Sequence, residues 1–202
     1  MDFSEFRQVS ALNQRLRRAL SVFRIVASHV GARGRSSDES ASHLAGRIGA
    51  IGRAMLAPIF FDGVDLESLV LDELRLHAVR PGQFSIGGSE VRLAPNAADL
   101  MSLVIHELAT NAVKYGALSQ PQAKISVTWT VVHRFGSRIL QFEWLETGVR
   151  IIAGAPPTPG FGSELIERLI ARELKGEGKM TFLTDGVSCA IEIPLDRRTA
   201  AP

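Results

Sequence analysis

Hydrophobic residues recur at three- and four-residue steps along the first thirty positions, which predicts one long helix. The spacing is interrupted by the Gly- and Ser-rich segment 31–40 and returns over residues 41–58. Two helices joined in this way form an antiparallel hairpin, which cannot bury both of its apolar faces alone. We therefore expect residues 1–60 to make the protein a homodimer, in which two hairpins form a four-helix bundle.

From residue 61 the spacing of apolar positions changes to a mixture of helical and alternating patterns. Because the helices and strands do not follow a strict βαβ repeat, we expect an α+β fold for residues 61–197. Asn96 is expected to cap the longest helix, Gly176 to close the last helix, and residues 198–202 to form a frayed tail. The predicted elements are helices over 65–78, 96–118 and 162–176, and strands within 83–95, 124–133, 138–146 and 178–195.

Composition indicates an ordinary globular protein, since 46% of the 202 residues are hydrophobic, 22% are charged and the formal net charge is +2. The near balance of charge is a weak argument for nucleic-acid binding. No apolar run reaches the ~18 residues of a membrane-spanning helix, and the single cysteine, Cys189, excludes an internal disulfide. We expect a cytoplasmic protein with no nucleic-acid partner and no membrane insertion, whose sensing domain or membrane anchor belongs to another chain.

One face of the helix predicted over 96–118 carries candidate chemistry. Glu107, Asn111 and Lys114 are four and three residues apart, so they share a helix face. The amide oxygen of Asn111 suits Mg²⁺, the charge of Lys114 suits phosphate, and Glu107 can act as a general base. The set predicts a site for a metal-bridged polyphosphate. The alternative is a solvated helix face with one stabilising charge pair.

Two further segments combine an acid or a helix start with glycine. Glu146 follows a predicted strand and precedes Gly148 by two residues, so its carboxylate can face a ligand that the glycine backbone approaches closely. Gly160 and Gly162 come just before a helix, where backbone N–H groups are suited to phosphate. Each segment alone is a weak signal, and the three in this order are much more specific.

The segments HELATNAVKYGALS, WLE and GFGSELIE, which begin at residues 106, 144 and 160, resemble the HWE group of bacterial histidine kinases, which have the GHKL ATP-binding fold. The resemblance covers the whole chain and implies an α/β sandwich that binds ATP and Mg²⁺. It implies that Asn111 lies at the metal and that Glu146 contacts the adenine amino group. The nucleotide-binding residues that it implies are Asn111, Lys114, Tyr115, Glu146, Gly148, Gly160 and Gly162.

This chain departs from the family after its Trp-x-Glu motif, where the family usually has x-Gly-Gly-Pro. Here the residues are Thr147-Gly148-Val149-Arg150, so one loop glycine is missing. The segment 149–159 is also short for a lid that closes over a nucleotide. These departures leave weak or lost nucleotide binding as an alternative.

The first helix resembles the phosphotransfer helix of the family, whose sequence is Leu-Asn-His-Arg-Val-Lys-Asn. Here residues 12–18 read LNQRLRR, so Gln14 stands at the position of the phosphorylated His and Arg18 at that of the Asn. Gln14 is a degenerate phosphoacceptor, because the lone pair of its amide nitrogen is delocalised and does not attack a phosphoryl group. His29 and His43 are the alternative acceptors, and neither has the neighbouring acid usual in the family.

The resulting hypothesis is a two-component signalling protein that is a pseudokinase, does not phosphorylate itself and acts by docking. Arg15, Arg17 and Arg18 would contact the acidic face of a response-regulator receiver domain or of another histidine kinase. The alternative is an active kinase or ATPase, dependent on ATP and Mg²⁺, that uses another acceptor or a partner protein. A nucleic-acid-binding helix pair is the least favoured hypothesis, because its arginines are spread around the helix without accompanying aromatic residues.

Overall fold

The computed structural model describes residues 46, 48–49, 63–78, 80–150, 165–196 and 199–200. Its three described residues before residue 60 have helical backbone, as the second predicted helix requires. The rest of the predicted hairpin, with Gln14 and its arginines, lies outside the described residues. So do Gly160 and Gly162.

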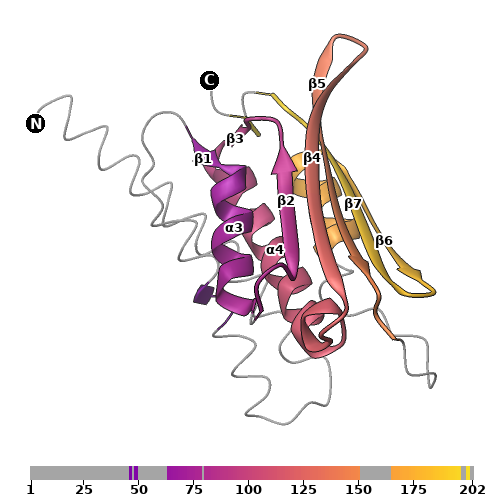
Figure 1. The fold of residues 1–202 in the computed structure, drawn as a ribbon. Coiled ribbons are helices and arrows are strands. Elements are labelled where there is room, and N and C mark those ends of the chain that lie inside the picture. Colours follow the sequence, from indigo (N-terminus) through magenta and orange to yellow (C-terminus); the bar gives the residue numbers. More distant parts are fainter. Residues whose placement is uncertain are drawn as a thin grey trace, which may run out of the picture.

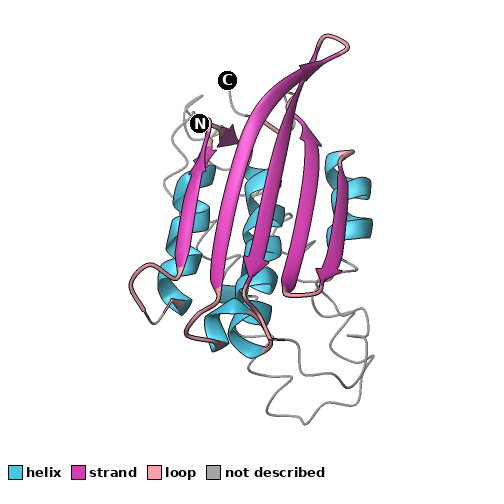
Figure 2. Cartoon of the chain, turned by 45° about the vertical axis from the view of Figure 1, so that its right-hand side comes forward, coloured by secondary structure: helices cyan, strands magenta, loops and turns pink. Residues whose placement is uncertain are grey.

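The described elements form a β-sheet with helices on one face (Figures 1 and 2). In chain order the elements are β1 (Val64–Asp65), α3 (Leu66–His77), β2 (Phe84–Gly88), β3 (Arg92–Leu93), α4 (Pro95–Lys114), a 3-10 turn (Ala117–Ser119), β4 (Lys124–Arg134), β5 (Ser137–Thr147), a π-helical turn (Leu165–Leu169), α6 (Ile170–Leu174), β6 (Glu177–Leu183) and β7 (Gly186–Pro194). Five strands pair in the order β2-β4-β5-β7-β6, and β1 pairs with β3 in a separate small sheet. This arrangement confirms the predicted α+β class.

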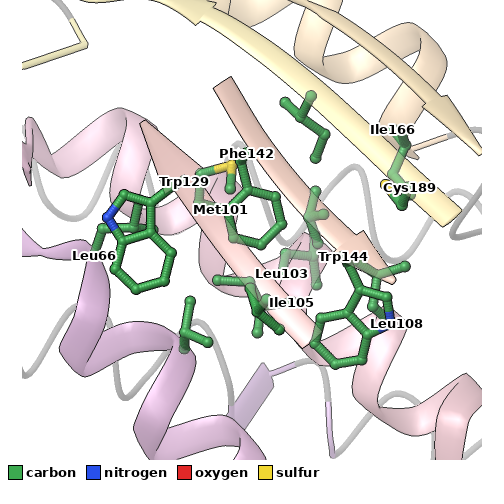
Figure 3. Packing of buried hydrophobic residues seen from close by; sticks show 14 of the residues in the cluster. Leu66, Met101, Leu103, Ile105, Leu108, Trp129, Phe142, Trp144, Ile166 and Cys189 are labelled. Carbon is green, nitrogen blue, oxygen red and sulfur yellow. The ribbon is translucent and has the colours of Figure 1, made fainter. Parts of the chain in front are cut away.

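The hydrophobic core lies between the sheet and the long helix α4, as Figure 3 shows. Phe142 and Trp144 are two residues apart on β5, so both side chains point to the same face of the sheet. Met101 and Leu108 on α4 are fully buried in the same cluster. Burying one such large apolar side chain stabilises the fold by about 1.5–3 kcal/mol.

Two antiparallel hairpins supply four strands of the main sheet. β4 and β5 pair antiparallel over their whole length and turn at Phe135 and Gly136, whose φ angles are 51° and 79°. Only the turn conformation with positive φ joins strands this closely, and it suits Gly136 better than Phe135. β6 and β7 pair in the same way and turn at Thr184 and Asp185, so Gly186 is the first residue of β7 and pairs with Leu183.

Two predicted helix ends are wrong by one or two residues. The N-cap of α4 is Ala94 rather than Asn96, and Pro95 follows it without any side-chain cap. Proline suits this place because its fixed φ fits the first turn and its missing N–H would have had no partner. The last helix closes at Lys175, whose φ is 55°, and Gly176 comes after it. A Cβ on Gly176 would lie 2.3 Å from the Glu192 carbonyl oxygen, so this glycine serves close packing.

The strands predicted within residues 83–95 are present, but they do not pair with each other. β2 joins the edge of the main sheet in parallel with β4, and β3 pairs with β1. The predicted frayed tail is also wrong at two residues. Thr199 is buried, its carbonyl accepts a hydrogen bond from the Ala94 N–H at 2.9 Å, and Ala200 forms an isolated bridge with Leu93.

A helix that crosses a bilayer must be both long and apolar. None of the helices in the described parts of the chain has both the length and the apolar character needed to cross a bilayer.

Candidate functional site

The C-terminal half of α4 carries the predicted acid, amide and lysine. Glu107 is buried, Asn111 is half-buried and Lys114 is exposed, so the three side chains lead from the core to solvent. Four apolar residues in this part of α4 are buried in the core, namely Leu103, Val104, Leu108 and Ala112. Glu107 and Lys114 both have interactions within the protein.

Glu146 lies near the end of β5 and is only 2% exposed. One carboxylate oxygen accepts a hydrogen bond of 2.7 Å from the backbone N–H of Ala117, and the other accepts one of 3.1 Å from the indole N–H of Trp144. Burial raises the pKa of the Glu146 carboxyl above its usual range, and the two hydrogen bonds lower it in part. The spacing Trp-x-Glu places both side chains on one face of the strand, which explains the indole contact.

Two glycines make room for Glu146. A Cβ on Gly116 would lie 2.0 Å from the Glu146 carboxylate, and a Cβ on Gly186 would lie 1.8 Å from its backbone oxygen. Gly116 comes two residues after the end of α4, so the end of the helix and the end of β5 approach closely. Neither glycine was predicted to contact Glu146, although Gly116 belongs to the motif that begins at residue 106.

Gly148 has a left-handed backbone conformation, with a φ of 72°, which glycine adopts without steric cost. The next two residues are held by hydrogen bonds, from the Val149 N–H to the Asp185 carbonyl at 2.8 Å and from the Arg150 N–H to the Gln120 side chain at 2.9 Å. The chain therefore leaves β5 by a fixed path as far as residue 150.

The residues around the end of α4 fit a bound nucleotide with a divalent cation. Thr110 has a buried hydroxyl without a hydrogen-bond partner among the described residues, and it lies next to Asn111 on the helix. A buried hydroxyl in this state is stabilised by a ligand that offers a donor or an acceptor. Tyr115, one of the predicted binding residues, is 71% exposed at the end of the same helix.

A second polar cluster joins α3 to α4. Nδ1 of His106 lies 2.6 Å from Oε1 of Glu73, and Nε2 of His77 lies 3.0 Å from the same oxygen. His106 was predicted only as part of a family motif, and Glu73 and His77 were not predicted. The spacing of four residues between Glu73 and His77 was the available signal, because it places them one helical turn apart.

Comparisons with known proteins point in one direction. No protein-family model matches the chain. A blue-light-activated histidine kinase of Brucella anthropi is 30% identical over 81 residues, which is 40% of this chain and 16% of that protein. The corresponding protein of Brucella ovis is 29% identical over 82 residues, again 40% of this chain and 16% of that protein. The similarity thus involves a small part of these longer relatives.

The fold has a solved counterpart. The histidine kinase domain of the Erythrobacter litoralis EL346 blue-light-activated histidine kinase superposes with a TM-score of 0.61 and 19% identity, and covers 95% of this chain and 93% of that one. At this identity the match concerns the fold, which agrees with the α+β arrangement described above. The resemblance seen in the motifs is therefore confirmed: this chain is similar to histidine kinases in sequence and in fold, and its HWE-type motifs are consistent with these relatives.

Proposed function

We propose that this chain is a two-component signalling protein that binds ATP and Mg²⁺ but does not phosphorylate itself. The observation that carries the proposal is Gln14, which stands at the phosphoacceptor position of a chain whose other motifs are kinase-like. An amide cannot take the phosphoryl group that an imidazole takes. The geometry around α4 and β5, in contrast, retains a set of groups suited to a nucleotide.

The nucleotide part of the proposal is supported by Glu146, Asn111 and Thr110. Both oxygens of Glu146 already accept one N–H, and a carboxylate has about four acceptor positions, so it can still accept an exocyclic amino group. Asn111 is half-buried and would supply an oxygen to Mg²⁺, with Lys114 and Tyr115 on the exposed side. The bound cation would offset the negative charge of the phosphates.

Glu107 is the proposed general base in any residual phosphotransfer. It is buried one helical turn before Asn111, so both reach the same region of the helix surface. A base acts only on a proton within hydrogen-bond reach. Without a phosphoacceptor on the chain, the base would serve a hydroxyl, water or partner side chain.

The docking part of the proposal rests on the sequence of the first helix. Arg15, Arg17 and Arg18 would bind the acidic face of a receiver domain or of another histidine kinase. Residues 1–60 would pair two copies of the chain. Gly160 and Gly162 would contribute backbone N–H groups to the phosphates.

The test incubates the purified protein with γ-labelled ATP and Mg²⁺, with and without receiver domains. The wild-type protein is expected to bind ATP and carry no acid-labile phosphate, whereas the Gln14→His variant is expected to be labelled. The matched control is the double variant Gln14→His/Asn111→Ala, which is expected to lose the label. Acid-labile phosphate on the wild-type chain would contradict the proposal.

The second candidate function is an active kinase or ATPase. It is favoured by the retention of Glu107 and Asn111 beside Thr110, whose buried hydroxyl has no hydrogen-bond partner in the part of the chain that the structure describes. It predicts Mg²⁺-dependent ATP turnover by the wild-type protein that is lost in Asn111→Ala, or labelling that moves to His29, His43 or an added partner protein. Absence of ATP binding at saturating nucleotide would exclude it.

A further inference from the structure

The contact between α3 and α4 contains three side chains that bind metals in other proteins. Glu73 and His77 lie one turn apart on α3, and His106 faces them from α4. One ligand atom from each residue lies within 4.8 Å of the other two. The cluster is separate from Glu146 and Asn111, which form the proposed nucleotide site.

The two imidazole rings converge on one carboxylate oxygen. Nδ1 of His106 and Nε2 of His77 lie 2.6 Å and 3.0 Å from Oε1 of Glu73. The ring centroids are 6.0 Å apart with an interplanar angle of 50°, so the rings are tilted and do not stack. The nitrogen atoms, rather than the ring faces, therefore point to the shared centre.

Two imidazole nitrogens and one carboxylate oxygen form a ligand set of the kind that holds Zn²⁺ with water in the fourth position. Zinc bonds of about 2.0–2.2 Å place neighbouring ligand atoms roughly 3.3–3.5 Å apart in a tetrahedral site. The two short distances to Glu73 need to lengthen by less than about 1 Å to reach that spacing. The ligand nitrogens of the two rings lie within 4.8 Å of each other.

Burial gives the cluster a closed side and an open side. The side chains of Glu73 and His106 are 4% and 9% exposed, and that of His77 is 26% exposed. An ion and its water therefore enter past His77. On the closed side, a Cβ on Gly46 would lie 2.9 Å from Nε2 of His106, so that edge of the ring packs against the backbone and Nδ1 is left to face Glu73.

We propose that Glu73, His77 and His106 bind one Zn²⁺ ion that clamps α3 to α4. Imidazole and carboxylate ligands in this combination suit zinc and neighbouring transition metals better than Mg²⁺ or Ca²⁺, which prefer all-oxygen sites. The ion fixes α4 at His106, five residues before Asn111. The site is independent of nucleotide and of Gln14, so it can be tested in the absence of ATP.

The experiment titrates the chelator-treated full chain with Zn²⁺ against a chromophoric competitor and records thermal unfolding with and without the ion. The wild-type protein is expected to bind one Zn²⁺ at this site and to unfold at a higher temperature when it is bound. In His77→Ala the affinity is expected to fall at least about 100-fold, since even supporting residues around a metal cost 10–100-fold when they are changed. His133→Ala, which alters an exposed histidine on β4, is the matched control and is expected to bind as the wild type does.

Two further measurements protect the test from a folding defect. Circular dichroism checks that His77→Ala is folded, and His77→Asn gives a second variant at the same position. The visible spectrum of bound Co²⁺ reports four-coordinate ligation in the wild type and is expected to change in both variants. Failure of the wild type to bind Zn²⁺, or an unchanged affinity in both His77 variants, would overturn the proposal and leave the cluster as a hydrogen-bonded triad.

Discussion

Glu146 and Glu73 are two buried carboxylates with almost equal exposure, 2% and 3%, and with different partners. Glu146 accepts hydrogen bonds from a backbone amide and an indole, and neither of these groups binds a metal ion. Glu73 is contacted by two imidazole rings, and imidazole is a common metal ligand. Burial alone thus does not decide what a carboxylate does; its neighbours decide whether it is oriented for recognition or completes a metal site.

The substitution with the largest expected effect disrupts the packing around Glu146. In Gly186→Ala the new Cβ meets the backbone oxygen of Glu146, 1.8 Å away in the present arrangement, and backbone atoms cannot move aside cheaply. We expect a loss of about 3 kcal/mol in the free energy of unfolding. Gly87→Ala is the control, because a Cβ there meets nothing within 4 Å. Equal denaturant midpoints for the two variants would contradict this account.

The substitution with the next largest expected effect tests whether Glu146 and Glu73 serve different ligands. Glu146→Gln places an NH₂ group opposite an N–H donor, so one buried hydrogen bond is lost at a cost of about 1–3 kcal/mol. ATP affinity is expected to fall with it, while Zn²⁺ affinity stays as in the wild type. Glu143→Gln, an exposed position on the same strand, controls for the loss of charge. Calorimetric titration with each ligand checks the prediction, and a parallel loss of both affinities would contradict it.

The reciprocal variant is Glu73→Gln. It removes the anionic ligand between His77 and His106, so Zn²⁺ affinity is expected to fall at least about tenfold. ATP affinity is expected to change less than about threefold, because the nucleotide residues on α4 are untouched. Asp72→Asn, exposed on the same helix, is the matched control. A variant that keeps its zinc and loses its nucleotide would reverse the assignment of the two sites.

The smallest effect concerns pH. Since burial raises the pKa of Glu146 above its usual 4.5, the folded protein holds this proton more tightly than the unfolded chain. The folded state therefore loses stability, relative to the unfolded state, as the pH rises from 4.5 through the folded pKa. Urea unfolding between about pH 4 and pH 8 is expected to show this decline in the wild type and not in Glu146→Gln. Parallel curves for the two proteins would argue against the pKa shift.

Local patterns in the sequence predicted where the helices and strands lie better than they predicted which strands pair. The hairpins β4–β5 and β6–β7 were predictable because each joins neighbouring segments through a short turn. The parallel pairing of β2 with β4 was not, since Ser85 pairs with Ser126 across the whole of α4. No local pattern encodes which strand a lone segment joins.

The candidate sites show the same difference between local relations, which the sequence predicts, and contacts between residues far apart in the chain. The spacing within α4 predicted that Glu107 and Asn111 share a helix face, because that relation is local. The hydrogen bond from Ala117 to Glu146 spans 29 residues, and the contact between Glu73 and His106 spans 33. Contacts of this kind depend on how α4 packs against the sheet and against α3, so they emerge only from the three-dimensional fold.

The most direct test of the account is the amount of acid-labile phosphate on the chain after incubation with ATP and Mg²⁺. The account predicts none on the wild-type protein, none on Gln14→Asn and clear labelling of Gln14→His, because only the last variant restores an imidazole at the acceptor position. Labelling of the wild-type chain, or no labelling of a folded and ATP-binding Gln14→His variant, would contradict the claim that the phosphoacceptor is the missing part.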